Sequence, residues 1–221
     1  PGGVGKTRLV LELALAIREE GTNRVVFVSL ATIRDTAFVA SAIAGALGLA
    51  DVTALELPQR ARVACEGYST LLVLDNFEQV LSAAPLVADL LTSVASLRVM
   101  VTSRARLRVR GEREYAVGPL ALEADSEAMS PADLARAPAV RLFVERARAA
   151  QPGFGLTPQN LAAVHEVCRR LDGIPLAIEL AAAWVRALSV EQIAARLVDG
   201  FHLLSGGTRG RRARHQTLAA T

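Results

Sequence analysis

The sequence has few cysteines and no long apolar run, and both absences limit what kind of protein it encodes. Only two cysteines occur, Cys65 and Cys168, far apart and in apolar surroundings. This pattern predicts two buried thiols in a reducing compartment rather than a disulfide framework. No charge-free apolar run reaches the roughly 18 residues of a membrane-spanning helix, and the first residues are rich in glycine rather than charged and then apolar. We therefore expect a cytoplasmic protein with no membrane partner.

Aromatic residues and lysine are also scarce. Aromatic residues make up 4% of the chain, and none is interleaved with the arginine run at 209–214. A solvated linker is therefore favoured there over a nucleic-acid-binding surface. All but one of the 25 basic residues are arginine, and the exception is Lys6. A compact ammonium can lie against phosphate oxygens inside a tight loop, where a planar guanidinium is too broad.

The first half of the chain alternates apolar segments of two kinds. Short β-branched runs predict strands that are covered on both faces, at 24–30, 70–76 and 97–103, with a shorter fourth at 113–117. Helical spacing predicts helices at 7–20, 35–49, 58–66 and 78–94, the last interrupted at Pro85. Such alternation favours an α/β fold, an open parallel sheet with helices on both faces and ligands at the carboxyl ends of its strands.

The second half lacks strand signals. The stretch 123–138 is polar and turn-prone, and helical segments follow at 138–151, 158–171, 175–187 and 190–198. We therefore expect a nucleotide-binding domain at 1–120, a small all-helical domain at 121–204 and a linker at 205–221. The Gly and Arg content of the last segment is typical of a linker.

The chain begins with most of a phosphate-binding loop. Residues 1–7 match the last seven positions of the pattern G-x-x-x-x-G-K-[ST]. A strand normally leads into such a loop, so we expect the P-loop sheet here to lack its first strand. Backbone N–H groups of the loop would converge on phosphate oxygens, Lys6 would neutralise the β- and γ-phosphates, and Thr7 would offer a hydroxyl to Mg²⁺. The loop residues that would form this cradle are Gly2, Gly3, Val4 and Gly5.

Acidic residues stand at the end of the strand at 70–76 and just after it. Asp75 stands where a carboxylate could reach Mg²⁺ directly or through water, although a strand-end aspartate can also simply begin a turn. Asn76 comes next and cannot act as a base. Glu78 could activate a water molecule, or it could be an acid favoured by the first turn of its helix. Slow or conditional hydrolysis is the expectation that follows.

One arginine stands at the end of the next strand. Arg104 would reach the same edge of the sheet, where it could contact the γ-phosphate and sense whether it is present. We expect the side chains of the arginines that follow it to be solvated. Guanine-specific phosphate-loop proteins need a second lysine to recognise the base, and the only lysine here is already used. Guanine is therefore disfavoured as the base.

In combination and order these motifs resemble the STAND or NB-ARC class of signal-transduction ATPases, especially those in bacterial transcriptional regulators of the LuxR and AfsR type. The matching segments are GGVGKT (2–7), LLVLDNFE (71–78), VTSR (101–104) and GIPLAIELAA (173–182). The resemblance implies that Pro175 contacts adenine, that Arg104 is the nucleotide sensor and that 214–218 leads into a winged-helix, DNA-binding domain on the same longer chain. An oligomer that forms with nucleotide is among the partners it implies. Gly173 and Pro175 also have a structural interpretation, since glycine ends helices and proline begins them.

Three functions remain open from the sequence. The favoured one is a regulatory switch that binds ATP and ADP with Mg²⁺ and passes their difference to effector domains. The alternative is a turnover ATPase or motor whose output is hydrolysis itself. The third is a nucleic-acid-binding module, which would need the arginine-rich tail to bind duplex DNA directly.

Overall fold

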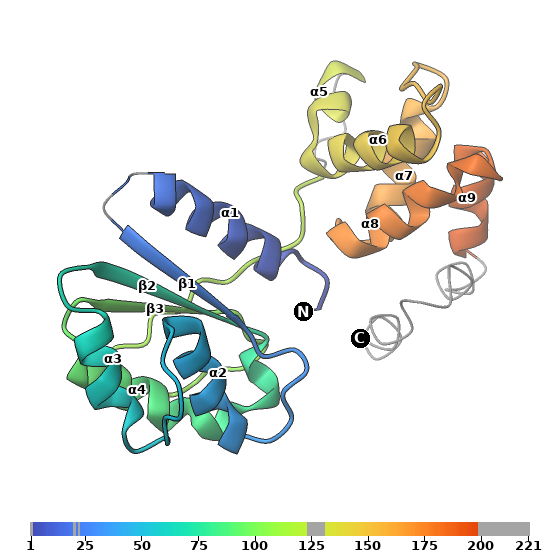
Figure 1. Cartoon of the computed structure of the whole chain (residues 1–221). Coiled ribbons are helices and arrows are strands. Elements are labelled where there is room, and N and C mark those ends of the chain that lie inside the picture. Colours follow the sequence, from blue (N-terminus) through green and yellow to red (C-terminus); the bar gives the residue numbers. More distant parts are fainter. Residues whose placement is uncertain (1, 20, 22, 123–130, 199–221) are drawn as a thin grey trace. The chain divides into compact units, whose positions relative to one another are not determined.

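The computed structural model describes residues 2–19, 21, 23–122 and 131–198, which belong to two compact units (Figure 1). One unit, called the sheet unit, comprises Lys6–Ala116. The other, called the helical unit, contains the chain from Val117 onward together with the first five residues. The predicted linker at 205–221 and the segment 214–218 lie outside the described residues.

The sheet unit is built on three parallel strands in the order β1-β2-β3. These are β1 (Asn23–Ser29), β2 (Ser69–Asp75) and β3 (Leu97–Val101). Ser29 pairs with Asp75, and Leu74 pairs with Val101, so the three carboxyl ends lie at one edge of the sheet. Four consecutive apolar residues and a burial that extends to Asp75 make β2 the most deeply buried strand, as expected of a strand with neighbours and helices on every side.

Helices cover both faces of this sheet (Figure 1). One face carries α2 (Ala37–Leu47), α3 (Leu57–Ala64) and α4 (Ala84–Ser93), which pack on Val26, Val28, Leu72 and Leu74. On the other face α1 (Lys6–Glu19) places Val10 and Ala14 against Leu71 and Val73. The predicted α/β architecture, a parallel sheet between helices, is confirmed.

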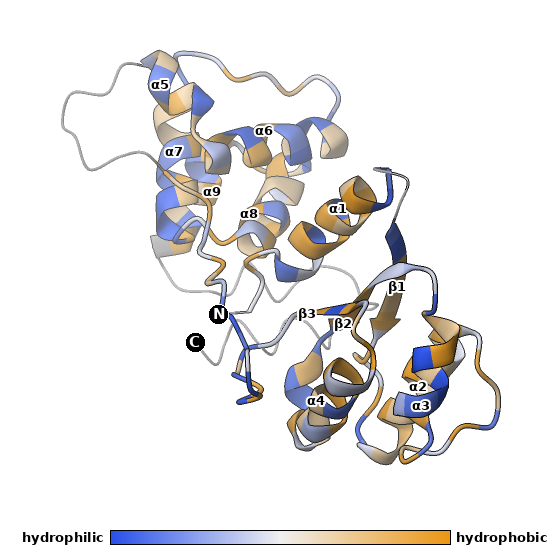
Figure 2. Cartoon of the chain, turned by 90° about the vertical axis from the view of Figure 1, so that its left-hand side faces the viewer, coloured by the Kyte–Doolittle hydropathy of each residue, from blue (hydrophilic) through white to orange (hydrophobic). Residues whose placement is uncertain are grey.

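Helix α1 is apolar along most of its length (Figure 2). Only Val10 and Ala14 are buried on it, while several leucines are 40–45% exposed: Leu9, Leu11, Leu13 and Leu15. The apolar pattern identified the helix, but not which of its faces packs on the sheet.

Two predictions in this half were wrong. The stretch 113–117 is not a strand: all of its residues except the half-buried Val117 are exposed, Tyr115 by 82%, and no neighbouring strand pairs with them. Short runs without an apolar face cannot hold a position in a sheet by burial. The segment 78–94 also does not form α-helix on both sides of Pro85, because 3₁₀ turns at Phe77–Gln79 and Leu81–Ala83 precede α4. Pro85 lies in the first turn of α4, where proline needs no N–H partner, so it begins the helix rather than interrupting it.

The helical unit contains helices and no strand among its described residues. The helices are α5 (Pro131–Arg136), α6 (Pro138–Ala150), α7 (Leu161–Arg170), α8 (Pro175–Ala182) and α9 (Val190–Val198), and a 3₁₀ turn (Ala183–Arg186) continues α8. Their buried sides enclose one core around Phe143, Val164 and Ile178. Helix α5 was not predicted, since its stretch was assigned to turns. Proline at its start and an acid in its first turn are typical of a helix N-terminus.

Gly173 shows why a glycine ends α7. Its φ of +63° lies in the left-handed region, and a Cβ atom there would come within 2.2 Å of the Leu120 carbonyl oxygen. The Leu120 N–H donates a hydrogen bond to the Gly173 carbonyl at 2.9 Å. Only glycine permits this close approach of two backbone segments.

Both cysteines are buried and unpaired, as the sequence predicts. Burial raises the pKa of the Cys168 thiol to about 12. Within the described ranges, no helix is long and apolar enough to cross a membrane.

Stability of the helical unit should depend on pH through Glu166 on α7. Arg169 donates hydrogen bonds to both of its carboxylate oxygens, at 2.7 and 2.8 Å, and Arg170 donates another. The hydrogen bonds from Arg169, reinforced by Arg170, lower the pKa of Glu166 to about 2 from its usual 4.5. We expect Glu166→Gln to reduce the free energy of unfolding at pH 7 by about 0.5–1 kcal/mol, because the pair is partly solvated.

A depressed pKa stabilises the folded state above the unfolded-state value, and the contribution is lost as pH falls toward the folded-state value. The difference in the free energy of unfolding between Glu166→Gln and the wild type should therefore disappear as the pH falls from 4.5 to about 2. Urea unfolding followed by fluorescence of Trp184, the only tryptophan, measures this unit. An equal difference in unfolding free energy at pH 7 and at pH 3 would contradict the lowered pKa of Glu166.

Candidate functional site

Asp75 is a buried carboxylate at the carboxyl end of β2, with 4% of its surface exposed. Its Oδ1 accepts a hydrogen bond from the Thr7 hydroxyl at 2.7 Å and another from the Thr102 hydroxyl at 2.5 Å. Thr7 lies in the first turn of α1, and Thr102 directly follows β3. Hydrogen bonds to a charged acceptor are stronger than neutral ones, so this junction joins three elements at the sheet edge.

Thr102 makes hydrogen bonds at this junction through both its hydroxyl and its backbone. It is 4% exposed, and its Oγ1 accepts the Asn76 N–H at 3.0 Å while donating to Asp75. Its backbone N–H donates to the Leu74 carbonyl, and its carbonyl accepts the Phe77 N–H, both at 3.0 Å. Sequence reasoning gave Thr102 no role. The sequence did offer one signal: Thr102 carries a hydroxyl and directly follows a buried strand, the neighbour of the strand that ends in Asp75.

The chain turns sharply after Asp75. Asn76 has a φ of +64°, a left-handed conformation that asparagine tolerates better than most residues. This turn directs the chain away from the strand and places Glu78 beside the end of β3 rather than in line with β2. Asn76 therefore has a role in the backbone conformation, in addition to having a side chain that cannot act as a base.

Glu78 and Arg104 form an ion pair at the same edge of the sheet. The Arg104 Nε donates to the Glu78 Oε1 at 3.0 Å. The Glu78 side chain is largely covered, with 17% exposed, whereas that of Arg104 is 49% exposed. The proposed base and the proposed sensor thus contact one another.

Thr7 and Asp75 were expected to share one Mg²⁺, and the structure brings their oxygens together. Within the described ranges no group of three His, Cys, Asp or Glu side chains could hold a metal. Mg²⁺ in nucleotide sites takes one or two protein oxygens and completes its shell with water and phosphate oxygens. A hydroxyl and a carboxylate in contact fit that requirement.

Two of the loop glycines adopt conformations that need glycine. Gly3 and Gly5 have φ values of +75° and +93°, and Val4 between them is buried. In the helical unit, the Gly3 carbonyl accepts the N–H of Leu176 at 3.1 Å. Pro175, the first residue of α8, therefore lies directly beside a residue that contacts the loop. Lys6 follows as the first residue of α1.

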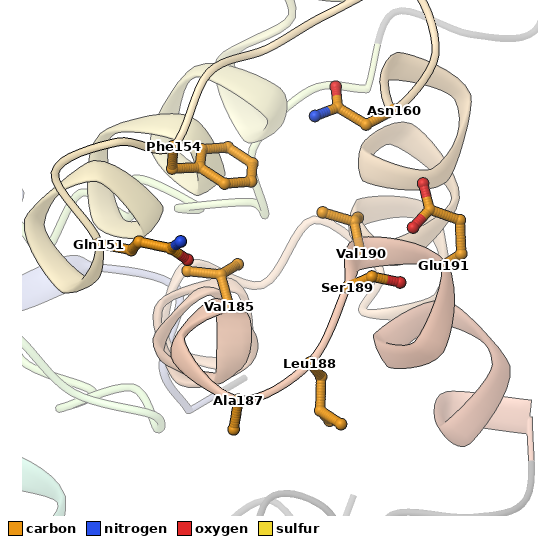
Figure 3. A pocket seen from close by; sticks show the side chains of 9 residues that line it. All are labelled: Gln151, Phe154, Asn160, Val185, Ala187, Leu188, Ser189, Val190 and Glu191. Atoms are coloured by element: carbon orange, nitrogen blue, oxygen red, sulfur yellow. The ribbon is translucent and has the colours of Figure 1, made fainter.

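The helical unit also contains an open cavity of about 400 Å³ (Figure 3). Phe154 and Val185 line it, with Asn160, Ser189 and Glu191 as polar neighbours. These polar groups bond within their own turns: Asn160 with Thr157 and Gly155, and Ser189 with Gln192. A hydrogen bond from Ser189 lowers the pKa of Glu191. The cavity was not predicted from the sequence.

Comparison with known proteins links the chain to parts of longer mycobacterial proteins. Over all 221 residues it is 42% identical to a Mycobacterium tuberculosis protein named provisionally as an HTH-type transcriptional regulator, and to its Mycobacterium bovis counterpart. It spans 23% of the length of these relatives. It is also 36% identical over 222 positions to an uncharacterised M. tuberculosis protein, of which it spans 53%. No family model matches the chain.

The Asp75 junction predicts a specific loss in Thr102→Val. Valine keeps the shape but removes a donor to a buried carboxylate and an acceptor for the Asn76 N–H. We expect a loss of about 2 kcal/mol in the free energy of opening of β2 and β3, measured by hydrogen exchange of their amides. Thr102→Ser should recover most of it.

Thr70→Val is the matched control. Thr70 is also fully buried in β2, but its hydroxyl has no partner among the described residues. Removing an unpaired buried hydroxyl should be neutral or stabilising. Equal losses in Thr70→Val and Thr102→Val would mean that valine is simply tolerated poorly in this core.

Proposed function

We propose that this chain binds ATP and ADP with Mg²⁺ and works as the nucleotide-dependent switch of a longer regulatory protein. The observation that carries the proposal is the Thr7–Asp75 contact at the carboxyl edge of a parallel sheet. It joins the residue that ends the G-G-V-G-K-T sequence to the acid that ends a neighbouring strand. Ligands of open parallel sheets bind at this edge.

Each residue of the loop has a role in the proposed site. Backbone N–H groups of 2–5 would hold phosphate oxygens, helped by the positive φ values of Gly3 and Gly5. Lys6 would neutralise the β- and γ-phosphates. Thr7 and Asp75 would hold Mg²⁺, which when bound neutralises phosphate charge.

Adenine is the proposed base because the chain offers no second lysine for guanine recognition. Pro175 is the proposed contact for adenine. Its neighbour Leu176 donates a hydrogen bond to the Gly3 carbonyl, so the first turn of α8 and the loop are adjacent in the helical unit. This adjacency supports a shared role in nucleotide binding.

A switch is favoured over rapid turnover by the residues after β2. Asn76 cannot accept a proton, and Glu78 is paired with Arg104. A ligand shifts a conformational equilibrium only through contacts that differ between states, and Arg104 would supply one by contacting the γ-phosphate. The long relatives, two of which are named provisionally as HTH-type transcriptional regulators, support effector domains on the same chain, and we propose that DNA is bound there rather than by this segment. A nucleotide-dependent oligomer remains part of this proposal.

Loss of the Lys6 ammonium should abolish nucleotide binding. Lys6→Ala in the full chain should show no heat of binding with Mg-ATP or Mg-ADP in calorimetry. Arg8→Ala is the matched control, because Arg8 is an exposed cation two residues further along α1, and it should bind as the wild type does. Unchanged affinity in Lys6→Ala would refute the loop as the binding site.

Steady-state and single-turnover rates separate the switch from a turnover ATPase. The switch predicts hydrolysis well below the roughly 10 s⁻¹ typical of enzymes, with ADP retained after one turnover. Turnover at or above that rate with no retained ADP would instead support the ATPase alternative. Binding of duplex DNA by the chain alone, weakening steeply with salt, would support a nucleic-acid-binding module.

A further inference from the structure

The ion pair between Glu78 and Arg104 has a geometry that suits positioning better than proton transfer. We infer that Glu78 is a positioning residue that holds the Arg104 guanidinium through Nε and so leaves its two terminal nitrogens available to the γ-phosphate. This inference rests on the proposed nucleotide site. It replaces the earlier hypothesis that Glu78 is a general base.

The contact uses only one of the donors of the guanidinium. Arg104 donates through Nε to Glu78 Oε1, and in the described part of the chain its terminal nitrogens donate no hydrogen bond. A guanidinium is planar and rigid, so a partner at Nε fixes the plane in which the terminal N–H groups point. Those groups form the fork that recognises phosphate oxygens with two parallel hydrogen bonds.

Burial and backbone hydrogen bonds hold in place the segments that carry Glu78 and Arg104. Phe77, next to Glu78, is fully buried, and its N–H donates to the Thr102 carbonyl. Arg104 follows Thr102 by two residues. The turn that carries Glu78 and the strand end that carries Arg104 are thus joined by the Thr102 hydrogen bonds, which reduces the freedom of the pair.

A neighbouring ion pair shows the contrast. Arg106 and Glu114 also pair through Nε, but their side chains are 72% and 47% exposed. Exposed pairs of this kind contribute little, because water and salt compete for the charges. The Glu78 carboxylate, at 17% exposure, is better shielded from both.

Glu78 is poorly placed to act as a base. A general base must present an oxygen to the attacking water. One of its oxygens accepts the guanidinium, and the other is covered by the protein and has no partner among the described residues. Neither oxygen is therefore presented to a water molecule.

The test compares affinities for Mg-ATP and Mg-ADP by calorimetry in the full chain. Arg104→Ala should lower the ATP-to-ADP affinity ratio toward one. Glu78→Ala should lower that ratio by roughly fivefold or more and leave ADP affinity unchanged, which also shows that the variant is folded. The double variant should be no worse than Arg104→Ala, because Glu78 acts only through Arg104. Glu78→Gln should keep most of the ratio, since its amide oxygen can still accept from Nε.

Glu114→Ala is the matched control, since it removes the same charge from the exposed pair and should leave the ratio unchanged. If Glu78→Ala fails to fold, Glu78→Asp tests the same point, because its shorter side chain should reach Nε poorly and lower the ratio. A wild-type ratio in the folded Glu78 variant would overturn the inference, as would equal loss of hydrolysis in Glu78→Gln and Glu78→Ala with unchanged ATP affinity. A wild type that binds neither nucleotide would overturn the proposed function, and the inference with it.

Discussion

The organisation of this site depends on one buried carboxylate. Removing an ionised aspartate from water is costly unless hydrogen bonds compensate for it. Thr7 and Thr102 supply two such bonds to a single oxygen of Asp75. Because these donors come from α1 and from the end of β3, satisfying the carboxylate also fixes where the first helix begins and where two strands end. Hydroxyl and carboxylate oxygens are also the kind of ligand that Mg²⁺ prefers.

The architecture of the sheet unit was predictable because strands covered on both faces leave a strong signal. Continuous apolar runs such as that of β2 identified all three strands, and the parallel arrangement followed from the helices between them. The closeness of Thr7 and Asp75 was also predictable, since a phosphate-binding loop normally follows a strand of the same parallel sheet, and the carboxyl ends of such strands share an edge. The false strand at 113–117 shows the limit: a short run without an apolar face carries no information about a pairing partner.

Side-chain partners beyond the strand ends were not predictable. The Glu78–Arg104 contact depends on the left-handed turn at Asn76, which local pattern does not reveal. Thr102 gained its position from the register of β3 against β2, a pairing of residues far apart in sequence. In both cases the sequence indicated which residues are chemically capable, and tertiary packing determined which of them contact one another. Residue type alone left Glu78 open as a base or as a first-turn acid, and its contact with Arg104 is the observation behind the positioning role inferred above.

We propose above all that the Thr7–Asp75 edge holds nucleotide together with Mg²⁺. Calorimetric titration of ATP into the full wild-type chain, once with Mg²⁺ and once with a chelator in its place, tests this directly. We expect saturable binding of one ATP per chain that weakens by about tenfold or more without the metal, since protein oxygens would then face phosphate without a cation between them. Absence of binding, or equal affinity with and without Mg²⁺, would contradict it.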